Sequence, residues 1–372
     1  MSAANEKDDD GMNLKKDAVI AGNNGEYTII KLLGEGGFGA VYCVKATDGN
    51  EYAMKVEKKL LKRKHSKLKM EVAILKLVGE EKETVHFTKI IDRGKKEQYF
   101  FLVMELVGPS LDDMKRTRPH KVFSLPTGLK AGIQCLKAVA ALHKHGFIHR
   151  DLKPANYARG LNDKRTVVYL LDFGIARCYK NMAGDIKTPR SSVPFKGTVR
   201  FASRSCHRNK ELGPKDDCES WFYLLLDLII ETGLPWKKFA DRDKVIQCKD
   251  EMRENESRRK NSLFYNIKHT DYFDKVLEYL DSRTYADKID YEFLYEAVTL
   301  TGVRCGANMD APYDWDKDSA TRTSTTQATV TTGGNNKTKK SSKSTQSSNQ
   351  RTTKTNKQSR QCSSSEVSPQ SD

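Results

Sequence analysis

Apolar residues follow two different spacings along this chain. Short, partly β-branched or aromatic runs at 41–44, 99–104 and 167–171 predict buried strands. Two longer segments, 62–77 and 127–145, repeat their apolar residues with the period of a helix instead. These segments predict a chain that combines short strands with long helices.

Two motifs arrange three chemical roles in order. The motifs are His149-Arg150-Asp151-Leu152-Lys153-Pro154-Ala155-Asn156 and, directly after a strand-like run, Asp172-Phe173-Gly174. Phosphoryl transfer needs positioned reactants and Mg²⁺ to neutralise charge. Asp151 is the candidate base, and Lys153 is the candidate contact of the transferred phosphoryl group. Asn156 and Asp172 are the candidate metal ligands. Either motif alone would fit a surface loop, but together they predict a protein kinase centre, and Lys153 favours Ser/Thr substrates.

A glycine-rich string precedes the first strand-like run. It reads Leu33-Gly34-Glu35-Gly36-Gly37-Phe38-Gly39-Ala40-Val41, and its glycines would let backbone N–H groups approach phosphates. Dinucleotide-binding folds use a similar string, but there a helix follows and an acidic residue lies about 20 positions on. Here a strand-like run follows, and Lys55 lies at roughly that distance. The string therefore predicts the nucleotide loop of a kinase.

Lys55 needs an anionic partner to hold it against the α- and β-phosphates. The predicted helix at 62–77 has an apolar stripe that includes Leu68 and Val72, and Glu71 would project from it toward the cleft. We therefore predict a Lys55–Glu71 ion pair. The alternative is that Glu71 is one more solvated charge on a basic helix.

The run at 99–104 ends in a segment with Gly and Pro, which suits a hinge between two lobes. Adenine is expected between Val41 and Ala53 on one side and Tyr157-Ala158 on the other, with Met104 at the back of the pocket. The predicted nucleotide-binding residues are Leu33, Gly34, Glu35, Gly36, Gly37, Phe38, Gly39, Ala40, Val41, Ala53, Lys55, Met104, Glu105 and Leu106.

Three further segments resemble the casein kinase 1 superfamily, most closely its tau-tubulin kinase branch. They are Met104-Glu105-Leu106-Val107-Gly108-Pro109-Ser110-Leu111, Gly197-Thr198-Val199-Arg200-Phe201-Ala202-Ser203 and Asp216-Asp217-Cys218-Glu219-Ser220-Trp221-Phe222-Tyr223. The resemblance covers about residues 27 to 316 and ends at Pro312-Tyr313-Asp314-Trp315. It implies an α+β, bilobal kinase fold with a β-rich N-lobe and a mostly helical C-lobe. It also implies dependence on ATP and Mg²⁺, and protein substrates that are often acidic or already phosphorylated.

The resemblance carries over the roles given above and adds Asp217 as the buried anchor of a long C-lobe helix. One departure concerns the Ala-Pro-Glu motif of most kinases. This chain has Ala202-Ser203-Arg204, so the usual buried Glu–Arg pair cannot form. The family resembled also lacks that Glu, but its next residues differ from Arg204. The contacts of Arg204 are not predicted.

The chain is strongly basic, with 65 Lys and Arg against 49 Asp and Glu and a formal net charge of +16 at pH 7. Seven of the basic residues lie in the activation segment and just after it: Arg190, Lys196, Arg200, Arg204, Arg208, Lys210 and Lys215. Beside a phosphotransfer cleft, this basic strip is expected to attract acidic or phosphorylated peptides. The alternative is a solvated face. No module interleaves aromatic residues with the charge, so no specific nucleic-acid partner is expected.

Composition divides the chain into a polar, flexible N-terminal segment 1–26, a kinase domain 27–316 and a disordered tail 317–372. The tail holds ten basic and three acidic residues among many Ser and Thr. It is interpreted either as a solubilising extension or as a segment that binds an anionic, cytoskeletal partner. Its hydroxyls, such as those at 363–365, are candidates for autophosphorylation.

The apolar run at 224–230 is too short for a membrane span and contains Asp227, so a core helix is expected. The eight cysteines lack Cys-x-x-Cys spacing, which predicts reduced thiols and a cytoplasmic or nuclear location. A monomer is expected.

Three functions compete: an active Ser/Thr kinase, a nucleotide-binding pseudokinase scaffold, and a polyanion- or microtubule-binding protein that acts through the tail. The presence of the candidate base and both candidate metal ligands favours the first. Four hydroxyls of the activation segment are candidates for phosphorylation, namely those of Thr188, Ser191, Ser192 and Thr198. The family resemblance argues against an obligatory switch there.

Overall fold

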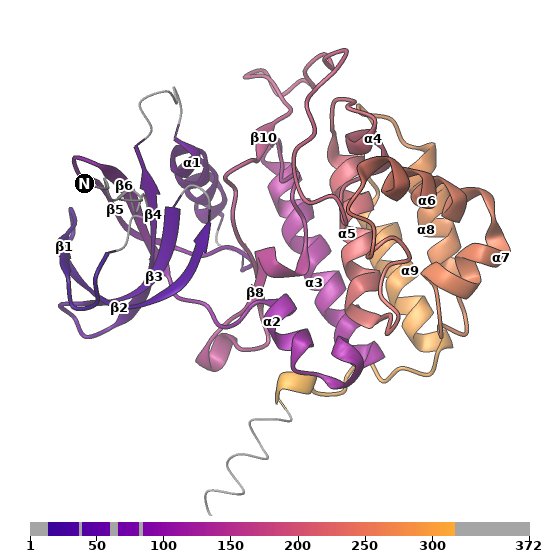
Figure 1. The fold of residues 1–372 in the computed structure, drawn as a ribbon, viewed down its shortest axis with the longest axis horizontal. Helices are drawn as coiled ribbons and strands as arrows, with labels where there is room; N and C mark the ends of the chain where they lie inside the picture. Colours follow the sequence, from indigo (N-terminus) through magenta and orange to yellow (C-terminus); the bar gives the residue numbers. More distant parts are fainter. Residues whose placement is uncertain (1–13, 37–38, 60–65, 82–84, 317–372) are drawn as a thin grey trace, which may run out of the picture. The chain divides into compact units, whose positions relative to one another are not determined.

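The computed structural model describes residues 14–36, 39–59, 66–81 and 85–316. Strands β1 to β6 and helix α1 form an N-lobe, and most of the helices form a C-lobe (Figure 1). This arrangement confirms the expected α+β, bilobal fold.

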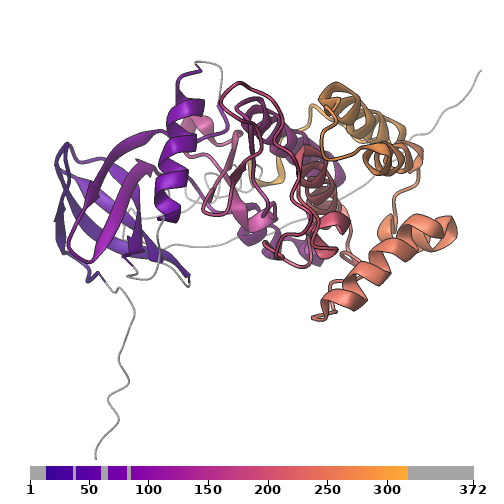
Figure 2. The same ribbon diagram turned by 90° about the horizontal axis from the view of Figure 1, so that it is seen from above.

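The N-lobe is an antiparallel sheet with one helix against it. Its strands are β1 (Val19–Ala21), β2 (Glu26–Gly36), β3 (Gly39–Ala46), β4 (Glu51–Lys58), β5 (Ile90–Lys95) and β6 (Tyr99–Glu105). They pair in the order β1-β2-β3-β4-β6-β5. Helix α1 (Lys67–Gly79) lies beside this sheet (Figure 2), and the side chain of Ser66 caps its first turn. The helix therefore begins five residues later than the predicted segment 62–77.

Strand β1 lies within the segment 1–26 that was expected to be flexible. Ile20 is buried there, and β1 pairs with β2. The turn that follows is tied to β5, because the backbone N–H of Asn24 and the hydroxyl of Tyr27 both donate to Asp92, at 2.9 and 3.1 Å. One buried side chain and one distant carboxylate thus order a polar stretch. Residues 1–13 lie outside the described residues.

The C-lobe is built around two long helices, α3 and α5. Its helices are α2 (Leu111–Arg116), α3 (Leu125–Lys144), α4 (Arg204–His207), α5 (Pro214–Ile229), α6 (Arg242–Glu254), α7 (Glu256–Arg258), α8 (Asp271–Ser282) and α9 (Tyr291–Arg304). Gly132 brings α3 close to α5, since an added Cβ there would lie 2.4 Å from a Leu225 methyl. The indole of Trp221 donates to the carbonyl of Gly132 at 2.7 Å. The apolar run at 224–230 therefore belongs mainly to a buried core helix.

Four short strands carry the segments of the candidate active site: β7 (Phe147–Ile148), β8 (Tyr157–Arg159), β9 (Val168–Leu170) and β10 (Arg177–Cys178). Strands β7 and β10 pair with each other, as do β8 and β9. No helix in the described ranges is long and apolar enough to cross a membrane.

Candidate active site

A buried carboxylate holds the catalytic loop in place. Asp217, near the start of α5, accepts hydrogen bonds from the backbone N–H groups of His149 and Arg150, at 2.6 and 2.9 Å. Nε2 of the His143 ring lies 2.9 Å from the same carboxylate. Burial acts to raise the pKa of Asp217, but these hydrogen bonds and the charges of the two histidines outweigh it and lower the pKa. Asp217 thus anchors the loop to the C-lobe core as an anion.

Three neighbours fix the carboxyl group of Asp151. The amine of Lys153 lies 2.8 Å from one of its oxygens, and the hydroxyl of Thr198 donates to the other at 2.6 Å. The side-chain amide of Asn156 donates to the Asp151 backbone carbonyl at 2.8 Å and to its carboxyl group at 3.4 Å. Lys153 also donates to Thr198, at 3.1 Å, which closes a small network. The carboxyl group is therefore held in one orientation, as a general base requires.

Lys55 joins the two lobes. It extends from β4, and its amine lies 2.5 Å from Glu71 of α1 and 3.0 Å from Asp172. Glu71 is buried, so it is not the solvated helix charge of the alternative interpretation. The register β4–β6 places Lys55 opposite Leu102, within the most buried part of the sheet. One cation thus contacts a carboxylate from each lobe.

Lys55 is stabilised as a cation by the two carboxylates beside it. Burial lowers the pKa of Lys55, but the carboxylates of Glu71 and Asp172 outweigh it and raise the pKa overall. Burial likewise raises the pKa of Asp172, while Lys55 outweighs it and brings the pKa to about 2. Lys55 is therefore a cation and Asp172 an anion at neutral pH, as the binding of phosphate and metal requires.

Asp172 has a backbone conformation that non-glycine residues seldom adopt. Its φ is +62°, in the left-handed region, and Arg150 has a φ of +69°. Packing holds the turn, because the next residue, Phe173, is buried between the rings of Phe87 and His149, with centroids at 5.8 and 5.5 Å. Such conformations persist only where the surroundings impose them, and they cluster at functional sites.

The described parts of the glycine-rich string lie at the end of β2 and at the start of β3. Among the described residues, no atom lies within 4 Å of a Cβ added at Gly34 or Gly36, whereas a Cβ added at Gly39 would clash with the Val56 carbonyl. Sheet packing therefore explains Gly39 but not Gly34 or Gly36, and those two positions leave room for a ligand. Gly37 and Phe38 lie outside the described residues. Leu33 and Glu35 lie on β2, and Ala40 and Val41 lie on β3.

The other predicted adenine contacts lie on β4 and β6. Ala53 pairs with Met104 across these strands, and both are buried. The side chain of Glu105 forms an ion pair with Lys164 at 2.5 Å. Leu106 follows as the first residue after β6.

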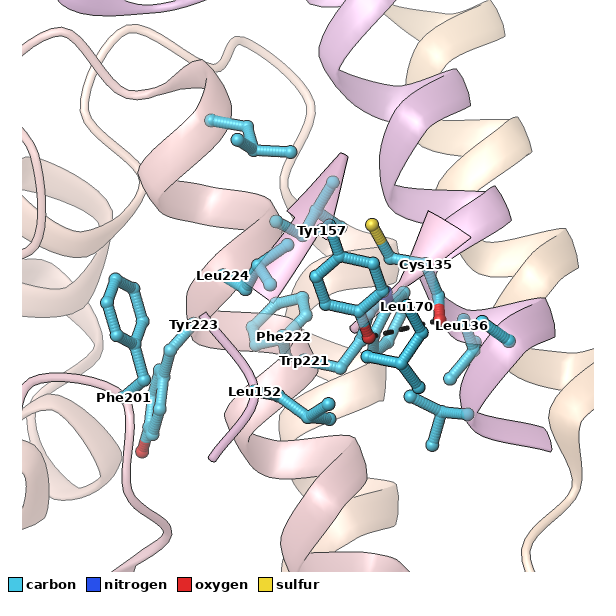
Figure 3. Close-up of a cluster of buried hydrophobic side chains, with 14 of the residues drawn as sticks. Cys135, Leu136, Leu152, Tyr157, Leu170, Phe201, Trp221, Phe222, Tyr223 and Leu224 are labelled. Atoms are coloured by element: carbon cyan, nitrogen blue, oxygen red, sulfur yellow. Dashed lines mark hydrogen bonds between the residues drawn. The ribbon is translucent and has the colours of Figure 1, made fainter. Parts of the chain in front are cut away.

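Tyr157 does not lie where the sequence analysis placed it. Its ring is fully buried in the C-lobe core, and its hydroxyl donates to the carbonyl of Cys135 at 3.3 Å (Figure 3). Successive residues of a strand point to opposite faces, so on β8 only Ala158 is left for the nucleotide side. The large apolar surface of the tyrosine favours the core.

Asn156 and Asp172 form a donor set suited to a hard divalent cation. The amide nitrogen of Asn156 is used in hydrogen bonds to Asp151, which leaves its oxygen for a ligand. Mg²⁺ prefers oxygen ligands and is usually held by one or two protein groups together with substrate phosphates. These two residues fit that pattern beside the cation of Lys55.

Arg204 has partners that the sequence did not reveal. Its guanidinium lies 2.7 Å from Asp281 of α8 and 3.4 Å from Asp250 of α6, and its backbone N–H donates to Glu219 at 3.1 Å. Buried Glu219 also lies 3.5 Å from Arg253. A different set of ion pairs thus ties the end of the activation segment to the C-lobe.

Known proteins share this domain. A model of the protein kinase domain matches residues 27–289. A probable serine/threonine-protein kinase of Dictyostelium discoideum is 34% identical over 294 residues, which cover 78% of this chain and 57% of that protein. The chain thus spans little more than half of that relative.

Two relatives from Caenorhabditis elegans are covered more fully. The putative serine/threonine-protein kinase ZK507.1 is 35% identical over 275 residues, 73% of this chain and 80% of the relative. The serine/threonine-protein kinase spe-6 is 30% identical over 297 residues, 79% and 76% of the two chains. With its domain match and these relatives, the chain belongs to the serine/threonine protein kinases.

Proposed function

We propose that this kinase transfers the γ-phosphate of Mg-ATP to Ser or Thr hydroxyls that lie in acidic or phosphorylated protein segments. The observation that carries the transfer chemistry is the fixed carboxyl group of Asp151 together with the Lys55–Asp172 pair. Membership of the casein kinase 1 superfamily, in its tau-tubulin kinase branch, is part of this proposal and is supported by the three segments that resemble it.

Each residue of the site has one task in this proposal. Asn156 and Asp172 hold Mg²⁺, which neutralises charge on the phosphates when it is bound. Lys55 positions the α- and β-phosphates, and Glu71 orients Lys55. Asp151 accepts the proton of the substrate hydroxyl, while Lys153 contacts the transferred phosphoryl group.

A surplus of positive charge next to Asp151 supports the preference for acidic substrates. Glu211 forms ion pairs with both Arg177 and Arg190, at 3.3 and 2.5 Å. The pKa of Lys196, a largely exposed residue, is lowered by partial desolvation and by the charges of Arg150, Arg190 and Arg177. These cations thus repel one another, and an anion bound among them would relieve the repulsion.

Other members of the basic strip are already neutralised. Arg204 and Arg208 both pair with Asp250, and Arg200 lies 3.9 Å from Asp227. The expected strip therefore narrows, in this proposal, to the cations that surround Lys196.

Kinetics on matched peptides test the preference. We expect kcat/KM to be at least about tenfold higher for a peptide with Asp or phosphoserine near the target Ser than for one with Asn or Ser there. Lys196→Met should reduce this ratio several-fold. Lys268→Met, at an exposed C-lobe lysine, should leave it unchanged. Equal rates on both peptides would overturn the preference but not the kinase activity.

A further inference from the structure

A groove on the N-lobe lies between α1 and strands β5 and β6. It has a volume of about 620 Å³, and none of its lining residues belongs to the candidate active site. Its apolar lining includes Leu68 and Val72 of α1 and Phe100 of β6. We call this feature the α1 groove.

Four cations surround the apolar lining: Lys69, Lys76, Arg93 and Lys95. All four are exposed, and the described residues that line the groove include no carboxylate. None of the four forms an ion pair with another described residue. In the C-lobe, by contrast, carboxylates neutralise many basic residues. The amine of Lys69 lies 5.8 Å from the centre of the Phe100 ring. Concentrated positive charge therefore lies directly beside apolar surface.

Helix α1 presents one face to the groove and another to the interior of the protein. Lys69, Val72 and Lys76 recur at the spacing of one helix face and line the groove. Glu71, Ile74 and Val78 lie on the buried side, where Glu71 meets Lys55. The groove thus adjoins the element that positions the catalytic lysine without sharing its residues.

We propose that the α1 groove docks a peptide segment of a partner protein in which an apolar anchor residue is flanked by acidic residues. The apolar lining would bury the anchor, and the cations would contact the flanking carboxylates. The complementary charge would then fix the position of the peptide along the groove. A concave site with a small apolar floor suits a single anchor side chain better than a flat bilayer surface.

Peptide binding without nucleotide tests this proposal independently of kinase activity. The probe is a fluorescein-labelled peptide Asp-Asp-Phe-Asp-Asp-Leu, titrated with the full chain and followed by anisotropy. We expect binding to weaken at least about tenfold when Asn replaces every Asp, and similarly when Ala replaces Phe. The double variant Lys76→Glu/Arg93→Glu should weaken binding by at least about tenfold as well.

The matched control is Lys268→Glu/Lys275→Glu, which changes the net charge equally at exposed C-lobe positions. It should alter binding less than about twofold. If the groove variant loses affinity because it misfolds, it will bind no peptide. If it folds, it should instead gain affinity for Lys-Lys-Phe-Lys-Lys-Leu, which the native chain should not bind.

Three results would overturn the proposal. One is an equal loss in the control variant, which would mean that only net charge matters. Another is binding that strengthens tenfold when residues 1–13 are removed, since their Glu6 and Asp8–Asp10 would then be the natural occupant. The third is binding of the chain to phosphatidylserine vesicles with the same dependence on Lys76 and Arg93, which would identify a membrane surface as the partner.

Discussion

The side chains around Asp151 show what a local motif can and cannot predict. Lys153 and Asn156 lie in the same loop as Asp151, so their spacing alone placed all three residues at one site. Their hydrogen bonds to Asp151 were not predicted. Thr198 is far away in sequence, and the pattern marked it only as a possible phosphorylation site. In the structure its hydroxyl donates to Asp151 at 2.6 Å. The available signal was that Gly197 and Thr198 begin one of the segments that resemble the casein kinase 1 superfamily.

Removing this hydroxyl should slow the chemical step. We predict that Thr198→Val lowers kcat about tenfold with little change in the KM for ATP, because Asp151 loses a hydrogen bond that orients it. Thr198→Ser keeps the hydroxyl and should recover most of the rate. Steady-state kinetics on both variants would decide, and equal losses in Val and Ser variants would contradict the orienting role.

Lys249 of α6 is a fully buried lysine that sequence reasoning missed. Its amine donates to the carbonyl of Ala202 at 2.6 Å and lies 4.6 Å from the centre of the Tyr223 ring. Burial lowers its pKa to about 7. A polar position in a helix gives no sign of burial when its partners are an aromatic ring and a backbone carbonyl from distant segments.

This lysine predicts a pH-dependent stability. Between about pH 7 and pH 10 the unfolded chain holds a proton on Lys249 that the folded chain has released, so the penalty for burying the charge fades as pH rises. The unfolding free energy of the native chain minus that of Lys249→Met should therefore increase by about 1 kcal/mol for each pH unit. Urea unfolding of both chains at pH 7, 8 and 9 measures this gain, and a constant difference would contradict it.

Among the elements, those with a strong internal pattern were predicted and those ordered by distant contacts were not. The 3.6-residue period of α3 and the apolar run of β6 suffice to identify them. Strand β1 has only one buried side chain, so its polar sequence resembles a free terminus. Tyr157 was expected beside adenine together with Ala158, but its ring lies in the core, because a short strand does not show in its sequence which residue meets the core.

The ion-pair cluster that replaces the usual Glu–Arg pair joins α5, α6 and α8. Arg253 is the most buried cation in it, with a side chain 7% exposed, and it contacts Glu219 and Asp281 at 3.5 and 3.0 Å. Arg204 contacts the same two carboxylate residues. Because these residues are far apart in sequence, Ala202-Ser203-Arg204 alone could not reveal the cluster.

We predict that Glu219→Gln lowers the unfolding free energy by about 3 kcal/mol, since it leaves buried Arg253 with less compensating charge. Glu278→Gln, at an exposed position of α8, is the matched control and should change stability by less than about 0.5 kcal/mol. Chemical denaturation of the three chains measures the effect. Similar stabilities for Glu219→Gln and the control would show that the cluster contributes little.

In the whole molecule, Lys55 contacts a carboxylate of each lobe, and Asp217 anchors the catalytic loop to the core of the C-lobe. If the cleft binds nucleotide as proposed, saturating Mg-ATP should stabilise the chain by about 2–3 kcal/mol at 100 times its Kd. Lys55→Met should lose most of this stabilisation, because the cation that meets both lobes is gone. Thermal unfolding with and without Mg-ATP tests it, and an undiminished shift in Lys55→Met would argue against the assigned role.

Phosphate transfer from γ-labelled Mg-ATP to casein tests the central claim most directly. The comparison uses the native chain, Asp172→Asn and a chain without residues 317–372. We predict incorporation by the native chain and by the shortened chain, and a loss of at least about a thousandfold in Asp172→Asn, because the proposed metal ligand loses its charge. If the native chain transfers no phosphate although Mg-ATP raises its unfolding temperature, the chain is a nucleotide-binding scaffold and the proposed catalysis is wrong.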